Sequence, residues 1–270
     1  MRLNQFLARG AGGSRREADG WIRDGRVLVN GAPPNGMGVD VDTAQDRVTL
    51  DGAPVQLPQA HRYLVYHKPA GFLVSRKSQG GKRTIFDALG ARIRGLHTIG
   101  RLDHESEGLL LLTDDGDLSE ALLHPRTGLL RRYRLWVTPV PDPSALRLLA
   151  AGTEVEGVHV APVLVEHEGV DRGRGVIIID LGEGRKREAR MLARAAGLDV
   201  SRLLRIRFGP IQLGTLRAGT IRALTEAEID ALRRIAFPRG HRDATLRPRS
   251  HHGAERRDPD GPAGSRFDPK

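Results

Sequence analysis

Apolar residues gather in short runs along this chain, and the central run predicts a strand buried on both faces. Residues 109–112 are four consecutive leucines that follow Gly108. A continuous apolar run of this length, bounded by turn residues, is typical of a strand inside a sheet. Residues 114–116, Asp-Asp-Gly, supply the turn that ends it. Asp103 precedes the run, so we expect its carboxylate in a loop beside a rigid strand.

The first part of the chain predicts a small module of its own. Apolar residues at helical spacing occupy positions 3–7, and glycines then interrupt that pattern. Ser14 and Glu17 have the spacing of a capping box, which opens a second helix. Short alternating stretches with turn residues continue to residue 56 and predict small strands. Residues 57–62 are interpreted as a linker.

The longer stretch from residue 63 to residue 237 holds enough strands and helices for a second, larger domain. Alternation along residues 131–137 places Arg131 and Tyr133 on one face of a strand and Arg132 on the other. Residues 185–196 have helical spacing, with arginines at 187, 190 and 194 sharing one face. Residues 238–270 carry almost no large apolar side chain, so we expect a basic disordered tail that contacts RNA loosely.

Charge changes this picture by indicating an anionic partner. The chain has 43 Lys and Arg against 33 Asp and Glu, a formal net charge of +10. Such an excess favours nucleic acid ahead of a membrane surface. Only five of the basic residues are lysine. Arginine forks onto phosphate and stacks on bases, which suits RNA, although a general arginine bias of the source proteome would give the same composition.

Several classes of protein are excluded or disfavoured by what the sequence lacks. There is no cysteine, which excludes disulfides and thiolate metal sites. The pair His251-His252 is too little for a metal site, so no metal is expected. We find neither a signal peptide nor a long apolar run, and we therefore expect a soluble cytoplasmic protein.

Asp103 is the candidate for chemistry. A carboxylate held on a rigid scaffold near a cation such as Arg101 stays ionised and can act as a nucleophile. The commoner use of an Asp in a glycine-rich loop is as a turn or cap residue, so composition alone favours that structural role.

The motif around Asp103 nevertheless resembles a known family. Residues 100–116, GRLDHESEGLLLLTDDG, resemble the signature of the RsuA/RluB group of pseudouridine synthases. The resemblance implies that Asp103 is the catalytic nucleophile in the isomerisation of uridine to pseudouridine, with the target base flipped out and no cofactor. Attack at ribose C1′ and attack at uracil C6 both stay open. The family usually has Asn in place of Asp114, in the turn after the strand and away from the chemistry.

Three further motifs extend the resemblance to about residue 237. HPRTGLLRRYRLWV resembles the family's second motif, which implies that Tyr133 lines the active site; packing across strands is the commoner use of a tyrosine. EGRKREARML resembles the third motif, which implies that Arg190 pairs with Asp103. Glu188, Ala189 and Met191 depart from that motif, where Gln, Val and a second Arg are common. The implied fold is α+β, with a mixed, largely antiparallel sheet.

The RNA-binding residues follow from two resemblances. Residues 2–31 resemble the RNA-binding α/β domain named after protein four of the small ribosomal subunit, which implies phosphate contacts by Arg9, Arg15, Arg16, Arg23 and Arg26. KPAG resembles the opening motif of the catalytic domain, and residues around it and the later motifs give Lys68, Arg101, Arg132, Arg185 and Arg187 as further contacts. A solvated basic surface is the alternative for each. The resemblance implies ribosomal RNA as the partner. The basic tail slightly favours the large subunit, and we expect the protein to act as a monomer.

Two other classes of function compete with the synthase. A non-catalytic RNA-binding or ribosome-assembly protein would have the same charge, but it need not keep Asp103 within a complete motif. A carboxylate-based hydrolase of nucleosides or glycosides requires a second acid, for which Glu105 or Glu107 are the candidates. The hydrolase does not explain the basic module.

Overall fold

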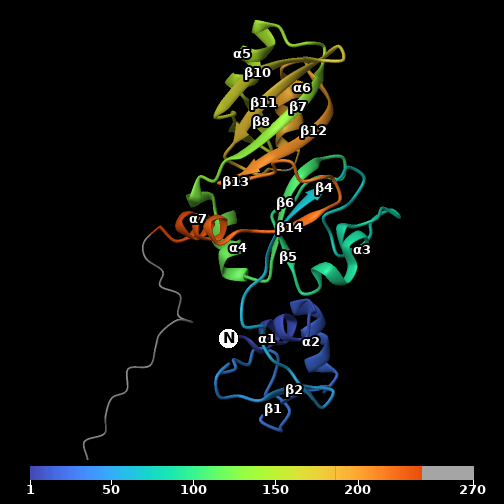
Figure 1. Ribbon diagram of the computed structural model, residues 1–270, viewed down its shortest axis with the longest axis vertical. Helices are drawn as coiled ribbons and strands as arrows, with labels where there is room; N and C mark the ends of the chain where they lie inside the picture. Colours follow the sequence, from blue (N-terminus) through green and yellow to red (C-terminus); the bar gives the residue numbers. More distant parts are fainter. Residues whose placement is uncertain (186, 239–270) are drawn as a thin grey trace, which may run out of the picture. The chain divides into compact units, whose positions relative to one another are not determined.

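Strands from separate stretches of the chain build the large sheet on which the fold is arranged (Figure 1). The computed structural model describes residues 1–185 and 187–238, and Met1–Pro238 form one compact unit. The disordered tail predicted for residues 238–270 lies outside the described residues, apart from Pro238 itself.

The N-terminal residues have a hydrophobic cluster of their own. Their elements are α1 (Leu3–Gly10), α2 (Arg15–Arg23), β1 (Val27–Val29), β2 (Val48–Leu50) and β3 (Ala53–Pro54), and the strands pair in the order β1-β2-β3. Ser14 and Glu17 form the predicted capping box at the start of α2. Leu57 also packs against this cluster, so its contacts continue into the predicted linker. The division into module, linker and catalytic domain stays a prediction.

The large sheet is mixed and mostly antiparallel, as expected. Its main path runs β10-β11-β7-β12-β6-β4-β14, with β5 paired to β6 and β13 paired to β12. Of these pairings only β12 with β6 is parallel. The strands are β4 (Tyr63–Lys68), β5 (His97–Ile99), β6 (Glu107–Thr113), β7 (Arg131–Thr138), β10 (Leu164–Asp171), β11 (Arg174–Leu181), β12 (Asp199–Phe208), β13 (Ile211–Gln212) and β14 (Ile221–Ala223).

Helices and a small hairpin complete the described part of the fold. They are α3 (Ile85–Leu89), α4 (Gly116–Leu123), α5 (Pro143–Ala151), α6 (Glu188–Ala195) and α7 (Glu226–Ala236), with two short 3-10 turns, η1 (Gly90–Ile93) and η2 (Pro125–Thr127), and the hairpin of β8 (Thr153–Val155) and β9 (Val158–Val160). Thr84 and Thr225 cap α3 and α7 through their hydroxyls, and each forms a full capping box.

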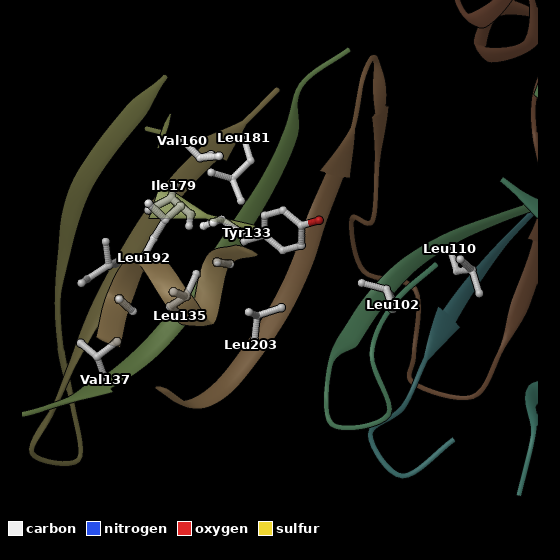
Figure 2. Close-up of a cluster of buried hydrophobic side chains, with 14 of the residues drawn as sticks. Leu102, Leu110, Tyr133, Leu135, Val137, Val160, Ile179, Leu181, Leu192 and Leu203 are labelled. Atoms are coloured by element: carbon white, nitrogen blue, oxygen red, sulfur yellow. The ribbon is translucent and has the colours of Figure 1, made fainter. Parts of the chain in front are cut away.

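The four central leucines lie in β6 and face two different cores, as the apolar run predicts. Leu110 and Leu112 belong to one buried cluster, while Leu109 and Leu111 belong to a second. Figure 2 shows part of the first cluster, in which Leu192 of α6 lies near side chains of the sheet. The loop before β6, which carries Asp103, is therefore anchored by a strand packed on both faces.

The helix predicted for residues 185–196 is shorter at its start. Helix α6 begins at Glu188 because Arg187 has a φ of +57°, a left-handed conformation that cannot continue a helix. Arg185 and Arg187 consequently lie in the loop between β11 and α6, and the shared helix face predicted for Arg187 and Arg190 does not form.

The parallel contact between β6 and β12 depends on a glycine. Gly108 is the register partner of Arg205 and has a φ of +109°. A β-carbon at this position would lie 2.3 Å from the carbonyl oxygen of Arg205 and 2.6 Å from its nitrogen. Backbone atoms cannot yield as a flexible side chain can, so only glycine permits this approach.

We predict that Gly108→Ala destabilises the protein far more than Gly197→Ala. Both positions have positive φ, but a β-carbon at Gly197 meets nothing within 4 Å. The left-handed backbone alone costs about 1 kcal/mol, whereas the clash at position 108 should bring the total to about 3 kcal/mol or more. Urea unfolding of the two variants measures the difference, and equal losses would contradict the packing argument.

Candidate active site

A cleft of about 280 Å³ opens beside the junction of β6 and β12. Its walls come from the loop before β6, from β7, from the loop between β11 and α6, from the start of α6 and from β12. Two carboxyl groups line it, those of Asp103 and Glu188, together with six arginines: Arg101, Arg131, Arg185, Arg187, Arg190 and Arg205. A small cleft with this excess of cations is suited to bind one portion of a larger anionic ligand.

The Asp103 carboxylate lies in this cleft without a fixed partner. Within the part of the chain that the structure describes, no hydrogen bond or ion pair engages its side chain, although the Asp103 carbonyl accepts from the Ser106 amide at 3.1 Å. The main chain of the loop is thus held while the carboxylate is left available. This combination suits a nucleophile.

Lys68 holds the main chain of that loop, which corrects the RNA contact predicted for it. Its side chain is fully buried, and its Nζ donates to the carbonyl oxygens of Ser106 at 2.7 Å, Pro69 at 3.0 Å and His104 at 3.3 Å. An ammonium enclosed by main-chain carbonyls does not reach RNA phosphate, so the contact expected for Lys68 does not fit this structure. Its position explains instead how the Asp103 loop keeps its shape.

The charge of Lys68 also reaches the carboxylate in front of it. Burial lowers the pKa of Lys68 to about 8, and the nearby Asp103 and Glu107 carboxylates oppose that change. Below that pH the ammonium stays charged. Lys68 therefore supplies a positive charge close to Asp103, the electrostatic role that sequence analysis gives to Arg190.

Tyr133 lies on β7 with its ring among aliphatic side chains. The residue is 9% exposed and belongs to the same buried cluster as Ile179 and Leu181. Figure 2 shows its hydroxyl directed away from those side chains. The alternation predicted for residues 131–137 is confirmed, because Arg131 and Tyr133 line the cleft and Arg132 does not.

Arg190 lines the cleft but is not paired with Asp103. Its Nη1 donates to the Val200 carbonyl at 2.9 Å, and within the described residues no ion pair joins it to a carboxylate. The predicted ion pair with Asp103 is therefore absent here, because the guanidinium is directed to Val200 near the start of β12. The Nε of Arg190 is buried and has no hydrogen-bond partner among the described residues.

Similarity to known proteins identifies the family of this chain. Residues 62–195 match the RNA pseudouridylate synthase family and residues 1–33 match the S4 domain. An uncharacterised RNA pseudouridine synthase of Aquifex aeolicus is 37% identical over 236 residues, which are 86% of this chain and 93% of the relative. The chain belongs to the RNA pseudouridylate synthase family. It is a pseudouridine synthase of the RsuA type, with an S4 domain at its N-terminus.

Two further comparisons agree with this assignment. The ribosomal large subunit pseudouridine synthase B of Yersinia pestis is 36% identical over 219 residues, covering 78% of this chain and 68% of the relative. A crystal structure of a pseudouridylate synthase superposes with a TM-score of 0.58 at 26% identity, covering 86% of this chain and 99% of that one. The fold class, the recognised family and the enzymatic reading of the sequence are thereby confirmed.

Glu188 is a second carboxyl group in the cleft of this synthase. It is 4% exposed, its Oε2 accepts the Arg185 amide at 3.0 Å, and its Oε1 is buried with no hydrogen-bond partner among the described residues. Burial raises the pKa of Glu188, and the amide of Arg185 only partly opposes this. The residue stands where the family commonly has Gln, and its environment favours the neutral form that resembles an amide.

The acids proposed for a hydrolase are engaged elsewhere. Glu105 forms an ion pair with Arg187 at 3.3 Å, and Glu107 accepts two hydrogen bonds from Arg202 at 2.9 and 3.1 Å. Neither is a free second acid for Asp103, which agrees with the synthase family. The Arg187 pair also joins the Asp103 loop to the loop before α6.

The other arginines predicted to bind RNA near the cleft differ in availability. Arg101 is exposed at the rim. Arg185 and Arg187 line the cleft, and each forms an ion pair with an exposed acid, Glu183 at 2.5 Å and Glu105 at 3.3 Å. Arg132 does not line the cleft and forms two hydrogen bonds with the buried Asp180 at 2.7 and 2.8 Å. This buried pair favours a structural role for Arg132 over the predicted RNA contact.

The predicted phosphate contacts of the S4 domain are largely on its surface. Arg15, Arg16 and Arg23 are exposed. Arg26 is exposed as well, but it forms a bidentate pair with Asp51 at 2.6 and 2.9 Å. Arg9 is partly buried and donates to the Pro58 carbonyl at 3.4 Å. Their contacts with RNA stay predictions.

Sequence analysis missed two arginines of the cleft, Arg131 and Arg205. Arg131 is buried, and its Nη1 donates to the carbonyls of Leu129 and Gly182 at 3.0 and 2.8 Å. Arg205 is buried on β12. An arginine on the same strand face as buried apolar residues was the available signal, because burying a charge is costly.

Among residues 1–185 and 187–238, none of the helices combines the length and the apolar character that a membrane span requires. In the same residues no group of three or more His, Cys, Asp or Glu side chains could hold a metal ion.

We predict that Lys68→Met lowers stability and turnover together. Three buried carbonyls would lose their donor, which costs about 1–3 kcal/mol, and the loop that carries Asp103 would lose its anchor. Thermal unfolding and single-turnover rates measure both effects. Lys82→Met, at an exposed lysine, serves as the stability control and should change little. Weaker RNA binding with unchanged stability and turnover would instead support the surface role first expected for Lys68.

We predict that Glu188→Gln stabilises the protein increasingly as pH rises. A carboxyl group whose pKa is higher in the folded than in the unfolded state loses stabilisation as pH rises through the interval between the two values. Glutamine avoids that loss and still accepts the Arg185 amide. Unfolding free energies of both proteins at several pH values from 4 to about 8 test this, and a constant difference would show that Glu188 titrates normally.

Proposed function

We propose that this synthase isomerises uridine to pseudouridine in ribosomal RNA of the large subunit, with Asp103 as the group that reacts. The observation that carries the proposal is an Asp103 carboxylate that has no partner among the described residues, on a loop fixed by Lys68, inside an arginine-lined cleft. The relatives named for the ribosomal large subunit support the choice of substrate.

The target base must leave its stack before it reaches this cleft. A glycosidic bond inside a helix is inaccessible, so the nucleotide flips outward. The exposed Arg101 is placed to hold an adjacent phosphate, and the half-exposed Arg187, which pairs with Glu105, can contact a second one. The ring of Tyr133 offers a surface on which the base can stack.

The chemistry requires no net change of atoms. The bond between C1′ and N1 breaks and its electron pair stays with uracil, while Asp103 acts as nucleophile or stabilises the charge. Uracil then rotates and C5 bonds to C1′. The proton on C5 leaves to solvent and N1 gains one. Asp103 can react because neither Arg190 nor any other described residue forms a hydrogen bond or an ion pair with its carboxylate.

The remaining parts of the proposal concern the setting of the reaction. We propose that the S4 domain binds the ribosomal RNA of a subunit or assembly intermediate, through Arg15, Arg16 and Arg23. We further propose that the protein acts as a monomer in the cytoplasm, and that it uses no cofactor.

We predict that the wild type releases tritium from C5-labelled uridine in large-subunit RNA transcripts and that Asp103→Asn does not. The Asn variant keeps the size and polarity of the side chain but removes the negative charge. RNA binding by both proteins, followed by filter retention, serves as the control. Binding without release by the wild type on either ribosomal RNA would favour the non-catalytic RNA-binding protein, and equal release by both would show that Asp103 is not the reacting group.

A further inference from the structure

Arg205 is buried in the wall of the cleft although no carboxylate neutralises it. It is 2% exposed, and within the described residues it takes part in no ion pair. Burial lowers the pKa of Arg205 from its ordinary value. Placing an unpaired guanidinium in a protein interior is costly. Such a departure from ordinary packing is expected where a residue serves the chemistry.

The contacts of Arg205 reach both chain segments next to Asp103. Its Nε donates to the Leu109 carbonyl at 2.7 Å, and its Nη1 donates to the Arg101 carbonyl at 3.4 Å. Arg101 precedes Asp103 by two residues, and Leu109 lies in the strand that follows. The planar guanidinium therefore spans the loop from which the carboxylate projects.

The same guanidinium lies beside Tyr133. Arg205 and Tyr133 are register partners on the antiparallel strands β12 and β7. The Tyr133 hydroxyl interacts with the guanidinium and raises the Arg205 pKa, which partly offsets the effect of burial. The remaining nitrogen, Nη2, is buried and has no hydrogen-bond partner in the described residues. Its N–H is therefore available to the Tyr133 hydroxyl on the paired strand.

We infer that Arg205 is a positioning residue of this synthase, which fixes the Tyr133 hydroxyl relative to the loop that carries Asp103. The inference rests on the proposed function. Arg205 contacts both segments at once, whereas Arg190 is directed to Val200 and Lys68 contacts the loop alone. A lysine at position 205 would keep the charge, but it lacks the planar guanidinium that can reach Leu109, Arg101 and Tyr133 at once.

The activity test compares Arg205→Lys with Arg207→Lys. Arg207 lies two residues along the same strand, is partly buried, and pairs with Asp180 at 2.9 Å outside the cleft. Arg205→Lys should lower kcat by about 10- to 100-fold with little change in KM, because a small misplacement of reacting groups has an effect of that size. Arg207→Lys should stay within about twofold of the wild type. Equal kcat values for the two variants would overturn the inference.

A double-variant cycle separates positioning from a general structural effect. If Arg205 acts through the Tyr133 hydroxyl, adding Arg205→Lys to Tyr133→Phe should reduce the single-turnover rate much less than it reduces that of the wild type. Full multiplication of the two effects would overturn the inference. If Arg205→Lys fails to fold, Arg205→Gln, which keeps an N–H donor, takes its place in the cycle.

A spectroscopic measurement tests the contact without relying on activity. The chain has three tyrosines, so protein labelled with 3-fluorotyrosine gives three fluorine signals, and Tyr133→Phe identifies that of Tyr133. Arg205→Lys should shift the Tyr133 signal and leave those of Tyr63 and Tyr66 in place, while Arg207→Lys shifts none. An unmoved Tyr133 signal would overturn the inference. Tritium release by the wild type tests the proposed function separately, so a failure of either is recognised.

Discussion

The close approach of two strands at Gly108 and Arg205 determines much of this structure. Register pairs between β6 and β12 are confined to Leu204 with Glu107 and Arg205 with Gly108. These two pairs connect the strands β10, β11, β7 and β12 to the strands β6, β4 and β14. The missing side chain of Gly108 lets the backbones meet, and the cleft forms where the two groups of strands join. Asp103 comes from one group and Tyr133 from the other.

A second constraint is the cost of burying positive charge next to Asp103, and main-chain carbonyls reduce that cost. Lys68 and Arg205 are buried cations close to Asp103, and within the described residues their side chains donate to main-chain carbonyl oxygens rather than to carboxylates. Carbonyl dipoles satisfy the N–H groups and reduce the cost of burial without forming an ion pair. The positive charges consequently remain near the cleft while the Asp103 carboxylate stays free. Direct pairing with either cation would have restricted the carboxylate's movement toward a nucleotide.

Local patterns in the sequence reveal helices and strands, but they do not reveal contacts that depend on the tertiary fold. The leucine run at residues 109–112 and the alternation around Tyr133 were readable because each reflects burial on defined faces. The start of α6 was misplaced because spacing does not reveal the left-handed backbone of Arg187. Lys68 was given an RNA contact through the resemblance of KPAG, and only the fold shows three carbonyls around its side chain. Arg190 was paired with Asp103 by resemblance, whereas the structure directs it to Val200.

Asp180 accepts from Arg132 and Arg207, which lie opposite one another on β7 and β12. Arg132 is also the register partner of Asp180 on β11. One carboxylate thus stabilises the alignment of three neighbouring strands. Sliding β11 past β7 would separate Asp180 from Arg132, and sliding β12 would separate Asp180 from Arg207. The same alignment sets Tyr133 opposite Arg205, next to Arg132 along the chain. An ion cluster outside the reaction cleft therefore favours the correct pairing of these strands during folding.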